Sequence, residues 1–369
     1  MKFTPLLLLL GCMSASAQDN YNLVIGTYTN ACESKGIYVY DFNANTADYK
    51  LKSNTQDVIS PSYITVSADN KFLYSVNEDG DNSTVSSFKY AAASGKMELI
   101  NKKDSKGEDP CYIINDEKHV IVANYTGGSI AVFDKEKTGG ISKAKQVIKH
   151  SGNSMDKDRQ TAPHVHMVYF SPDKKYVFAT DLGADKIYIY SYNPEGDNNN
   201  ILVLADTVSL KAGSGPRHLA FNPNSIFFYV LGELDASLTV FSYYNGKVEQ
   251  VQQLSVQPKD FTGKNGAAHI QVTKDGKYLY ATNRGDANTI SVFKMHANGL
   301  INLVQEVQTQ GEGPRSFTID PKGNYLLVAN QVTNDVIIFK RDKTTGVLSD
   351  TGKCIQLCAP ASLVFTPAK

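Results

Sequence analysis

The chain has 369 residues, of which 41% are hydrophobic, so it is long enough to bury a large core. Its 37 lysine and arginine residues balance its 37 aspartate and glutamate residues. Because no basic excess or basic stripe could neutralise a phosphate backbone, nucleic acid is excluded as an expected partner.

The first residues have the form of an export signal. Met1–Leu10 joins a lysine to an apolar run, and Ala15–Gln18 contains the small residues that signal peptidase prefers. We therefore predict a signal peptide at 1–17 and a mature protein at 18–369 that works in the periplasm. Cleavage before Cys12, which would carry a lipid anchor, is the alternative. The apolar run is shorter than the ~20 residues that span a bilayer, and no later stretch approaches that length.

After this leader, one pattern recurs seven times. Each unit opens with a turn and a short apolar strand, followed by a second turn and another apolar strand, as in 213–233. The opening positions are spaced 46 to 55 residues apart and fall at Pro61, Pro110, Val165, Pro216, Ala267, Pro314 and Pro360. A period near fifty with several short strands per unit is typical of a β-propeller. We predict an all-β, seven-bladed propeller in one domain, with four antiparallel strands per blade.

The two ends of the chain complete one blade. Residues 21–27 and 36–42 have the composition of strands, but the strand that opens every later unit does not precede them. A matching strand begins at Pro360, within the last ten residues of the chain. We therefore predict that the C-terminal strand pairs with the N-terminal strands, because such closure removes exposed sheet edges.

The complete units share one register. The opening residue and the residue that ends the second strand are 16 positions apart in five units and 14 apart in the unit of Pro110, which fits a shorter turn. Asn77, Asn124, Asp181, Asn283 and Asn330 end second strands, and we interpret them as turn formers. A fourth, more polar strand is expected at the outer edge of each blade.

Four cysteines would remain after cleavage at residue 17: Cys32, Cys111, Cys354 and Cys358. Cys354 and Cys358 are too far apart along one extended strand to form a disulfide. Cys32 could pair with one of them, because both ends of the chain should meet in one blade. Free buried thiols are the alternative.

Several motifs together resemble one propeller family. The absence of tryptophan argues against the Trp-Asp propellers and against propellers that dock their blades through tryptophan. From about Tyr21 onward the chain resembles the seven-bladed lactonases, typified by bacterial 6-phosphogluconolactonase and including fungal carboxymuconate cyclase. The motifs that carry this resemblance lie at 26–29, 34–40, 123–130, 163–166, 215–218 and 283–285.

Departures from the repeat indicate where a site was added. Two positions should surround one mouth of the channel: the residue after each opening position and the residue after each second strand. The first row reads Ser62, Cys111, His166, Arg217, Ala268, Arg315 and Ala361, and the second reads Thr27, Glu78, Tyr125, Leu182, Glu233, Arg284 and Gln331. His166, Arg217, Glu233 and Arg284 are also the residues that match the catalytic set of the resembled family, one by one.

These four residues suit the opening of a lactone ring. Either Glu233 or His166 could act as general base while the other delivers a proton, and Arg217 and Arg284 could stabilise an oxyanion. The alternative is a hydrated, charged channel mouth in which Arg217 and Glu233 form a structural ion pair.

Further candidates lie close to the same mouth. His164, Arg315 and Glu78 are candidate substrate-binding residues, with a solvated rim as the alternative for the last two. His164 is also the alternative to His166, which the repeat register favours. His218 and His269 should point into the packing between blades. The sequence contains no motif for a serine nucleophile, a zinc site or a nucleotide loop in a suitable context, so no metal or cofactor is expected.

We therefore predict an exported, monomeric lactonase that acts on a small sugar lactone and resembles 6-phosphogluconolactonase. Export conflicts with a phosphorylated substrate, because phosphogluconolactone is normally a cytoplasmic intermediate, so an unphosphorylated lactone is an alternative substrate. A lactone-forming cycloisomerase and a non-catalytic propeller that binds glycan or protein are the alternative functions.

Overall fold

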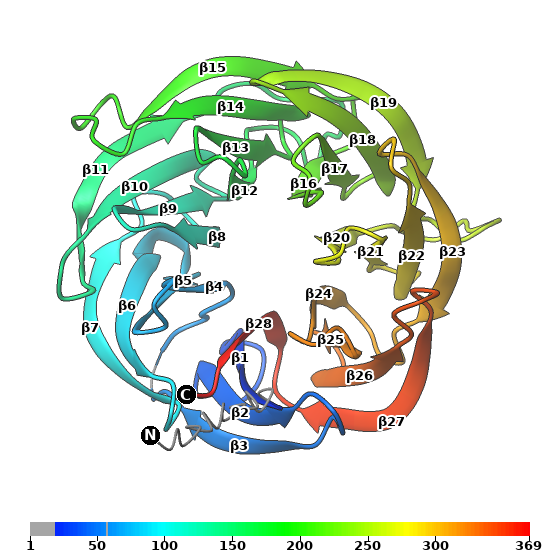
Figure 1. Cartoon of the computed structure of the whole chain (residues 1–369). Helices are drawn as coiled ribbons and strands as arrows, with labels where there is room; N and C mark the ends of the chain where they lie inside the picture. Colours follow the sequence, from blue (N-terminus) through cyan, green and yellow to red (C-terminus); the bar gives the residue numbers. More distant parts are fainter. Residues whose placement is uncertain (1–18, 57) are drawn as a thin grey trace, which may run out of the picture.

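The seven repeat units fold into seven four-stranded antiparallel sheets, arranged as a ring around a central channel (Figure 1). The computed structural model describes residues 19–56 and 58–369. The predicted signal peptide and Cys12 lie outside these residues. Within the described part, the one helix is the 3₁₀ turn η1 (Gly80–Asn82), and no helix is long and apolar enough to cross a membrane.

The innermost strands surround the channel, and the second strands pair with them. The innermost strands are β4 (Ile64–Val66), β8 (Pro110–Asn115), β12 (Val165–Phe170), β16 (Pro216–Phe221), β20 (Ala267–Val272), β24 (Pro314–Ile319) and β28 (Pro360–Pro367). The second strands are β1 (Asn20–Thr27), β5 (Phe72–Asn77), β9 (His119–Asn124), β13 (Tyr176–Asp181), β17 (Phe227–Gly232), β21 (Tyr278–Asn283) and β25 (Tyr325–Asn330).

The third and fourth strands form the outer part of each blade. The third strands are β2 (Ile37–Asn43), β6 (Thr84–Ala91), β10 (Ser129–Lys135), β14 (Lys186–Tyr192), β18 (Ser237–Tyr244), β22 (Thr289–Met295) and β26 (Asp335–Arg341). The outer strands are β3 (Tyr49–Asn54), β7 (Lys96–Asp104), β11 (Ile141–Lys149), β15 (Leu202–Ser209), β19 (Lys247–Ser255), β23 (Ile301–Gln308) and β27 (Leu348–Gln356). The seven-bladed fold predicted from the repeat is confirmed.

The ring closes as predicted, within one blade that contains both ends of the chain. β28 pairs with β1 in the sheet order β28-β1-β2-β3. A disulfide between Cys32 and Cys358 joins the two segments a second time. This pairing resolves the alternatives left open by the sequence, and Cys111 and Cys354 are free thiols.

Apolar faces hold neighbouring blades together. Between the first and last blades, Leu23 and Ile25 of β1 pack in one buried cluster with Leu327 of β25 and Ile338 of β26. Such side chains alternate along each strand because successive residues of a strand point to opposite faces of its sheet. The outer strands, by contrast, have many exposed positions, as in β7 and β19.

A β-bulge at the start of the innermost strand positions the first row of candidate residues. Pro216 pairs with Gly232 and His218 with Leu231, so Arg217 has no pairing partner on β17. The same shift leaves His166 and Arg315 unpaired in their blades. Because a bulge bends the strand and redirects its side chains, it explains how these residues turn toward the channel.

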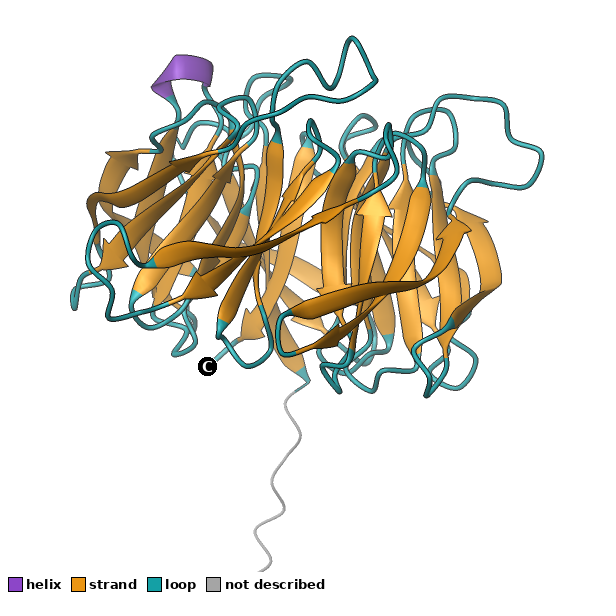
Figure 2. Ribbon diagram, turned by 90° about the horizontal axis from the view of Figure 1, so that it is seen from above, coloured by secondary structure: helices purple, strands orange, loops and turns teal. Residues whose placement is uncertain are grey.

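Polar residues at the ends of the second strands stabilise the loops on the same side of the ring. Asn77 donates a hydrogen bond to the carbonyl of Ile59, at 2.8 Å, and Asn330 donates one to the carbonyl of Thr309, at 3.2 Å. Asp181 accepts one from the amide of His164, at 2.8 Å. The interpretation of these residues as loop formers is supported by their bonds to backbone groups. In Figure 2 this face carries η1, and the C-terminus lies on the opposite face.

Candidate active site

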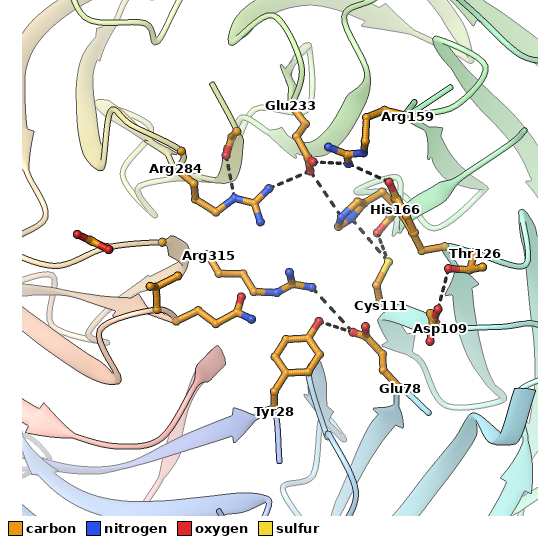
Figure 3. Close-up of a pocket in the computed structure, with 17 residues that line it drawn as sticks. Tyr28, Glu78, Asp109, Cys111, Thr126, Arg159, His166, Glu233, Arg284 and Arg315 are labelled. Atoms are coloured by element: carbon orange, nitrogen blue, oxygen red, sulfur yellow. Dashed lines mark hydrogen bonds and ion pairs between the residues drawn. The ribbon is translucent and has the colours of Figure 1, made fainter. Parts of the chain in front are cut away.

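A cavity of about 650 Å³ opens at the end of the channel where the second strands finish. His166, Glu233, Arg284, Arg315 and Glu78 line it (Figure 3). These five residues come from five different blades. The structure thus brings them together at one mouth of the channel, as the two rows of the repeat predicted.

Glu233 lies at the centre of an ion-pair cluster. Its Oε2 is 2.8 Å from Nε of Arg217 and 3.0 Å from Nη2 of Arg284. Its Oε1 accepts a hydrogen bond from Nη2 of Arg159, at 2.7 Å. One carboxylate is therefore surrounded by three guanidinium groups from β16, the β21 end and the loop before β12.

Two of these arginines differ in their access to the cavity. The side chain of Arg217 is only 2% exposed and does not line the cavity, and its Nη1 donates to the carbonyl of Ala268. Arg284 lines the cavity, and its Nε donates to the carbonyl of Gly266 at 2.8 Å. Arg284 can therefore contact a ligand directly, whereas Arg217 can act only through Glu233.

The surrounding charges fix the protonation of the cluster. Burial alone would raise the pKa of Glu233, but the charges of Arg284 and Arg217 outweigh it and hold this pKa far below its usual value. Burial and the neighbouring charge of Arg284 lower the pKa of Arg217 to about 9. At neutral pH Glu233 is therefore a fixed anion and a weak base.

His166 is the neutral partner of this anion. Its Nε2 is 4.0 Å from Oε2 of Glu233, and its side chain is buried. Burial lowers the pKa of His166 well below its usual value, and the charge of Arg217 lowers it further. On its other side, the thiol of Cys111 lies 3.2 Å from the carbonyl oxygen of His166 and 3.7 Å from Nδ1. The imidazole is therefore uncharged at neutral pH, and the charge of Glu233 is what favours its taking up a proton.

A second carboxylate lies across the cavity. Oε1 of Glu78 accepts hydrogen bonds from the hydroxyl of Tyr28, at 2.8 Å, and from the hydroxyl of Ser62. Nη2 of Arg315 is 3.8 Å from the same oxygen, and its guanidinium lies 5.1 Å from the centroid of the Tyr28 ring. Burial raises the pKa of Glu78, and the charge of Arg315 only partly opposes this effect.

Over residues 22–365 the chain matches the family described as "Lactonase, 7-bladed beta-propeller". The chain belongs to this family of lactonases. It is 35% identical to the 6-phosphogluconolactonase of Formosa agariphila over 88% of this chain and 94% of that protein. It is 30% identical to the 6-phosphogluconolactonase of Bacillus subtilis over 92% and 97% of the two chains. The solved periplasmic gluconolactonase of Pseudomonas aeruginosa is 33% identical, with a TM-score of 0.91 over 95% and 100% of the two chains.

Two residues of this lactonase-family site were missed from the sequence. Arg159 belongs to the loop before β12, which has no counterpart of fixed length in the repeat, and Nη2 of Arg159 also donates to the hydroxyl of Tyr125, at 3.0 Å. Tyr28 follows the second-row residue Thr27. Neither residue occupies one of the two fixed positions of the repeat unit, so the repeat could not single out either of them.

His164 supports the site without lining the cavity. Its ring stacks on that of Tyr125, with centroids 4.5 Å apart, and its Nδ1 lies 3.1 Å from the carbonyl oxygen of Tyr125. Tyr125 in turn presents its ring edge to His166, at 5.4 Å between centroids. His164 therefore helps to place Tyr125, which itself lines the cavity.

The prediction that His218 points into blade packing was wrong. Its ring contacts those of Tyr63 and Tyr112, at 6.3 and 5.2 Å between centroids, and these residues belong to blades two and three positions away. It also lies 5.3 Å from the ring of His166 and bonds to His269. Because the bulge redirects the start of the strand, this side chain fills the channel beneath the cavity.

The described residues provide no evident metal site. No group of three or more histidine, cysteine, aspartate or glutamate side chains in that part of the chain is arranged to hold a metal ion.

Proposed function

We propose that the protein hydrolyses a sugar lactone to the corresponding aldonic acid. The observation that carries this proposal is the placement of a neutral imidazole, His166, beside the ionised Glu233 in a cavity that also presents guanidinium groups. The names of the relatives above, 6-phosphogluconolactonase and gluconolactonase, support the same reaction.

His166 is the general base in this proposal. It accepts a proton from water, which adds to the carbonyl carbon of the lactone, and later returns the proton to the departing ring oxygen. Glu233 stays ionised and stabilises the protonated imidazole, so the lowered pKa of Glu233 supports His166 over Glu233 as the base. Arg284 stabilises the oxyanion, and Arg217 positions Glu233.

We further propose that the substrate is an unphosphorylated aldonolactone and that the protein is exported to the periplasm. The Cys32–Cys358 disulfide supports export, because such bonds persist in oxidising compartments. The periplasmic gluconolactonase among the relatives supports both points.

The test is the hydrolysis of glucono-δ-lactone and of its 6-phosphate by the purified mature protein, with correction for spontaneous opening. We expect turnover of the unphosphorylated lactone, and we expect His166→Ala to lower kcat by about 10²- to 10⁴-fold. His296→Ala is the matched control, because His296 is exposed and bonded to Asn302, outside the cavity. Absence of turnover on any lactone would contradict the proposal and favour a binding module.

A further inference from the structure

Arg159 is the most exposed of the three arginines that surround Glu233. Its side chain is 43% exposed, against 19% for Arg284 and 2% for Arg217. Figure 3 shows it beside Glu233 at the edge of the cavity, and its Nη2 also donates to the hydroxyl of Tyr125, at 3.0 Å. It is thus the guanidinium that an entering ligand can reach most easily.

The loop holds the backbone of Arg159 in a defined turn. The side chain of Asp156 accepts hydrogen bonds from the amides of Asp158 and Arg159, at 2.9 and 3.0 Å. The buried Gln160 donates to the carbonyl of Leu182, at 2.8 Å, and its own amide bonds to the carbonyl of Asp156, at 2.9 Å. Arg159 therefore projects from a fixed position, despite its exposure.

The guanidinium of Arg159 retains unused donors. Both of its hydrogen bonds, to Glu233 and to Tyr125, are made by Nη2. Among the residues that the structure describes, Nε and Nη1 have no hydrogen-bond partner, so their N–H groups remain for a ligand. A guanidinium binds carboxylates and oxyanions strongly because it offers several donors in a rigid plane.

The charge of the cluster favours an anionic ligand at this place. Three guanidinium groups surround the single carboxylate of Glu233, and Arg217 and Arg284 already contact its Oε2. One carboxylate neutralises only one of these three cations, so the cluster keeps a net positive charge. A negative charge that develops in the cavity would compensate this excess at little cost in reorganisation.

We propose that Arg159 is a catalytic residue that binds the negative charge formed as the lactone opens, a role that rests on the proposed lactone hydrolysis. Water gives one proton to His166 and adds to the carbonyl carbon, and the carbonyl oxygen becomes the oxyanion, which an unused N–H group of Arg159 binds together with Arg284. The ring C–O bond then breaks, and the ring oxygen takes the proton from His166. The resulting carboxylic acid loses its proton to solvent, and Arg159 retains the carboxylate until it leaves.

The test compares Arg159→Gln and Arg159→Lys with the wild-type protein on glucono-δ-lactone, and uses D-gluconate as a competitive product inhibitor. We expect Arg159→Gln to lower kcat by about 10²-fold while KM changes by less than about threefold, because the contact forms in the transition state. Arg159→Lys should recover part of this loss. We also expect the inhibition constant of gluconate to rise about tenfold or more in Arg159→Gln.

The matched control is Lys157→Gln, which removes one positive charge from an exposed position of the same loop. It should leave kcat, KM and gluconate inhibition as in the wild type. A second measurement separates contact with the substrate from support of Glu233: Arg159→Gln is repeated in a Glu233→Gln background. A further loss of about tenfold or more supports direct contact, and no further loss overturns it.

The outcomes separate this inference from the function on which it rests. If the wild type hydrolyses lactones and Arg159→Gln stays within about threefold of it, the role of Arg159 is overturned and the lactonase proposal stands. If the wild type hydrolyses no lactone, the proposed function fails, and the role of Arg159 fails with it.

Discussion

Glu78 and Glu233 occupy the same position of the repeat, in two blades that face each other across one cavity, yet their environments differ in charge. Glu233 contacts three guanidinium groups within 3.0 Å. Glu78 has one, 3.8 Å away, together with hydroxyl donors from Tyr28 and Ser62. Burial raises the pKa of both carboxyls, but only at Glu233 do the neighbouring cations reverse the shift.

The comparison shows that the number of nearby cations, more than burial, determines what a buried carboxyl can do. A carboxylate among three guanidinium groups keeps its charge and can stabilise a protonated histidine, but it is a poor proton carrier. A carboxyl such as Glu78 is more easily protonated, and its Oε2 makes no hydrogen bond within the described part of the chain. The half of the cavity around Glu233 therefore suits the reaction itself, and the half around Glu78 suits the binding of substrate hydroxyl groups.

Glu233→Gln should have the largest effect. It leaves three arginines without their common counter-charge, so we expect kcat/KM to fall by about 10³-fold or more. Removing one partner of a buried ion pair also lowers the free energy of unfolding, by about 3–5 kcal/mol. Steady-state kinetics and urea unfolding at pH 7 measure the two effects. A Glu233→Gln protein that keeps wild-type turnover would show that the cluster is only structural.

Loss of the Cys32–Cys358 disulfide should act mainly on the other half of the cavity. Tyr28 lies close to this bond, because its amide donates to the carbonyl of Ala359, the residue after Cys358, at 3.0 Å. The hydroxyl of Tyr28 in turn bonds to Glu78. We expect Cys32→Ser with Cys358→Ser to lower the free energy of unfolding by about 2–4 kcal/mol. KM should rise and kcat should change little, because Glu233 and its arginines lie on the opposite side.

The control for this pair is Cys354→Ser, which changes a free cysteine of the outer strand β27. Its unfolding midpoint should match that of the wild type. A double variant as stable as Cys354→Ser would show that β28–β1 pairing alone closes the ring.

The sequence was sufficient for the fold because each blade repeats the same spacing of turns and apolar strands. The opening residue and the end of the second strand pair directly, as Pro216 does with Gly232, and this constant register placed His166, Arg217, Glu233 and Arg284 at one mouth of the channel. It could not predict the orientation of His218, because that depends on a bulge that the apolar pattern does not record. Arg159 was missed for a related reason: it lies in a loop whose shape is fixed by Asp156 and Gln160 and not by the repeat.

Glu78→Gln is the matched partner of Glu233→Gln and should have the smallest effect. A raised pKa means that the folded state binds the proton of Glu78 more tightly than the unfolded state does, so its stabilising contribution is present at acid pH and is lost as pH rises above 4.5 and through the folded pKa. A neutral amide resembles the protonated form and avoids this loss. We therefore expect Glu78→Gln to change the free energy of unfolding by less than about 1 kcal/mol and to become more stable relative to the wild type as pH rises from 4.5 to 7.

Glu233→Gln should show the opposite slope, and it should show it at pH values below 4.5. The lowered pKa of Glu233 contributes stability above its unfolded value of 4.5, and that stability is lost as pH falls toward the folded pKa. The deficit of Glu233→Gln relative to the wild type should thus be largest at pH 7 and should shrink in acid. Urea unfolding of both variants from pH 7 to below pH 4.5 measures both slopes. Parallel slopes would mean that the two carboxyls have the same charge state. The number of neighbouring cations would then not distinguish Glu233 from Glu78.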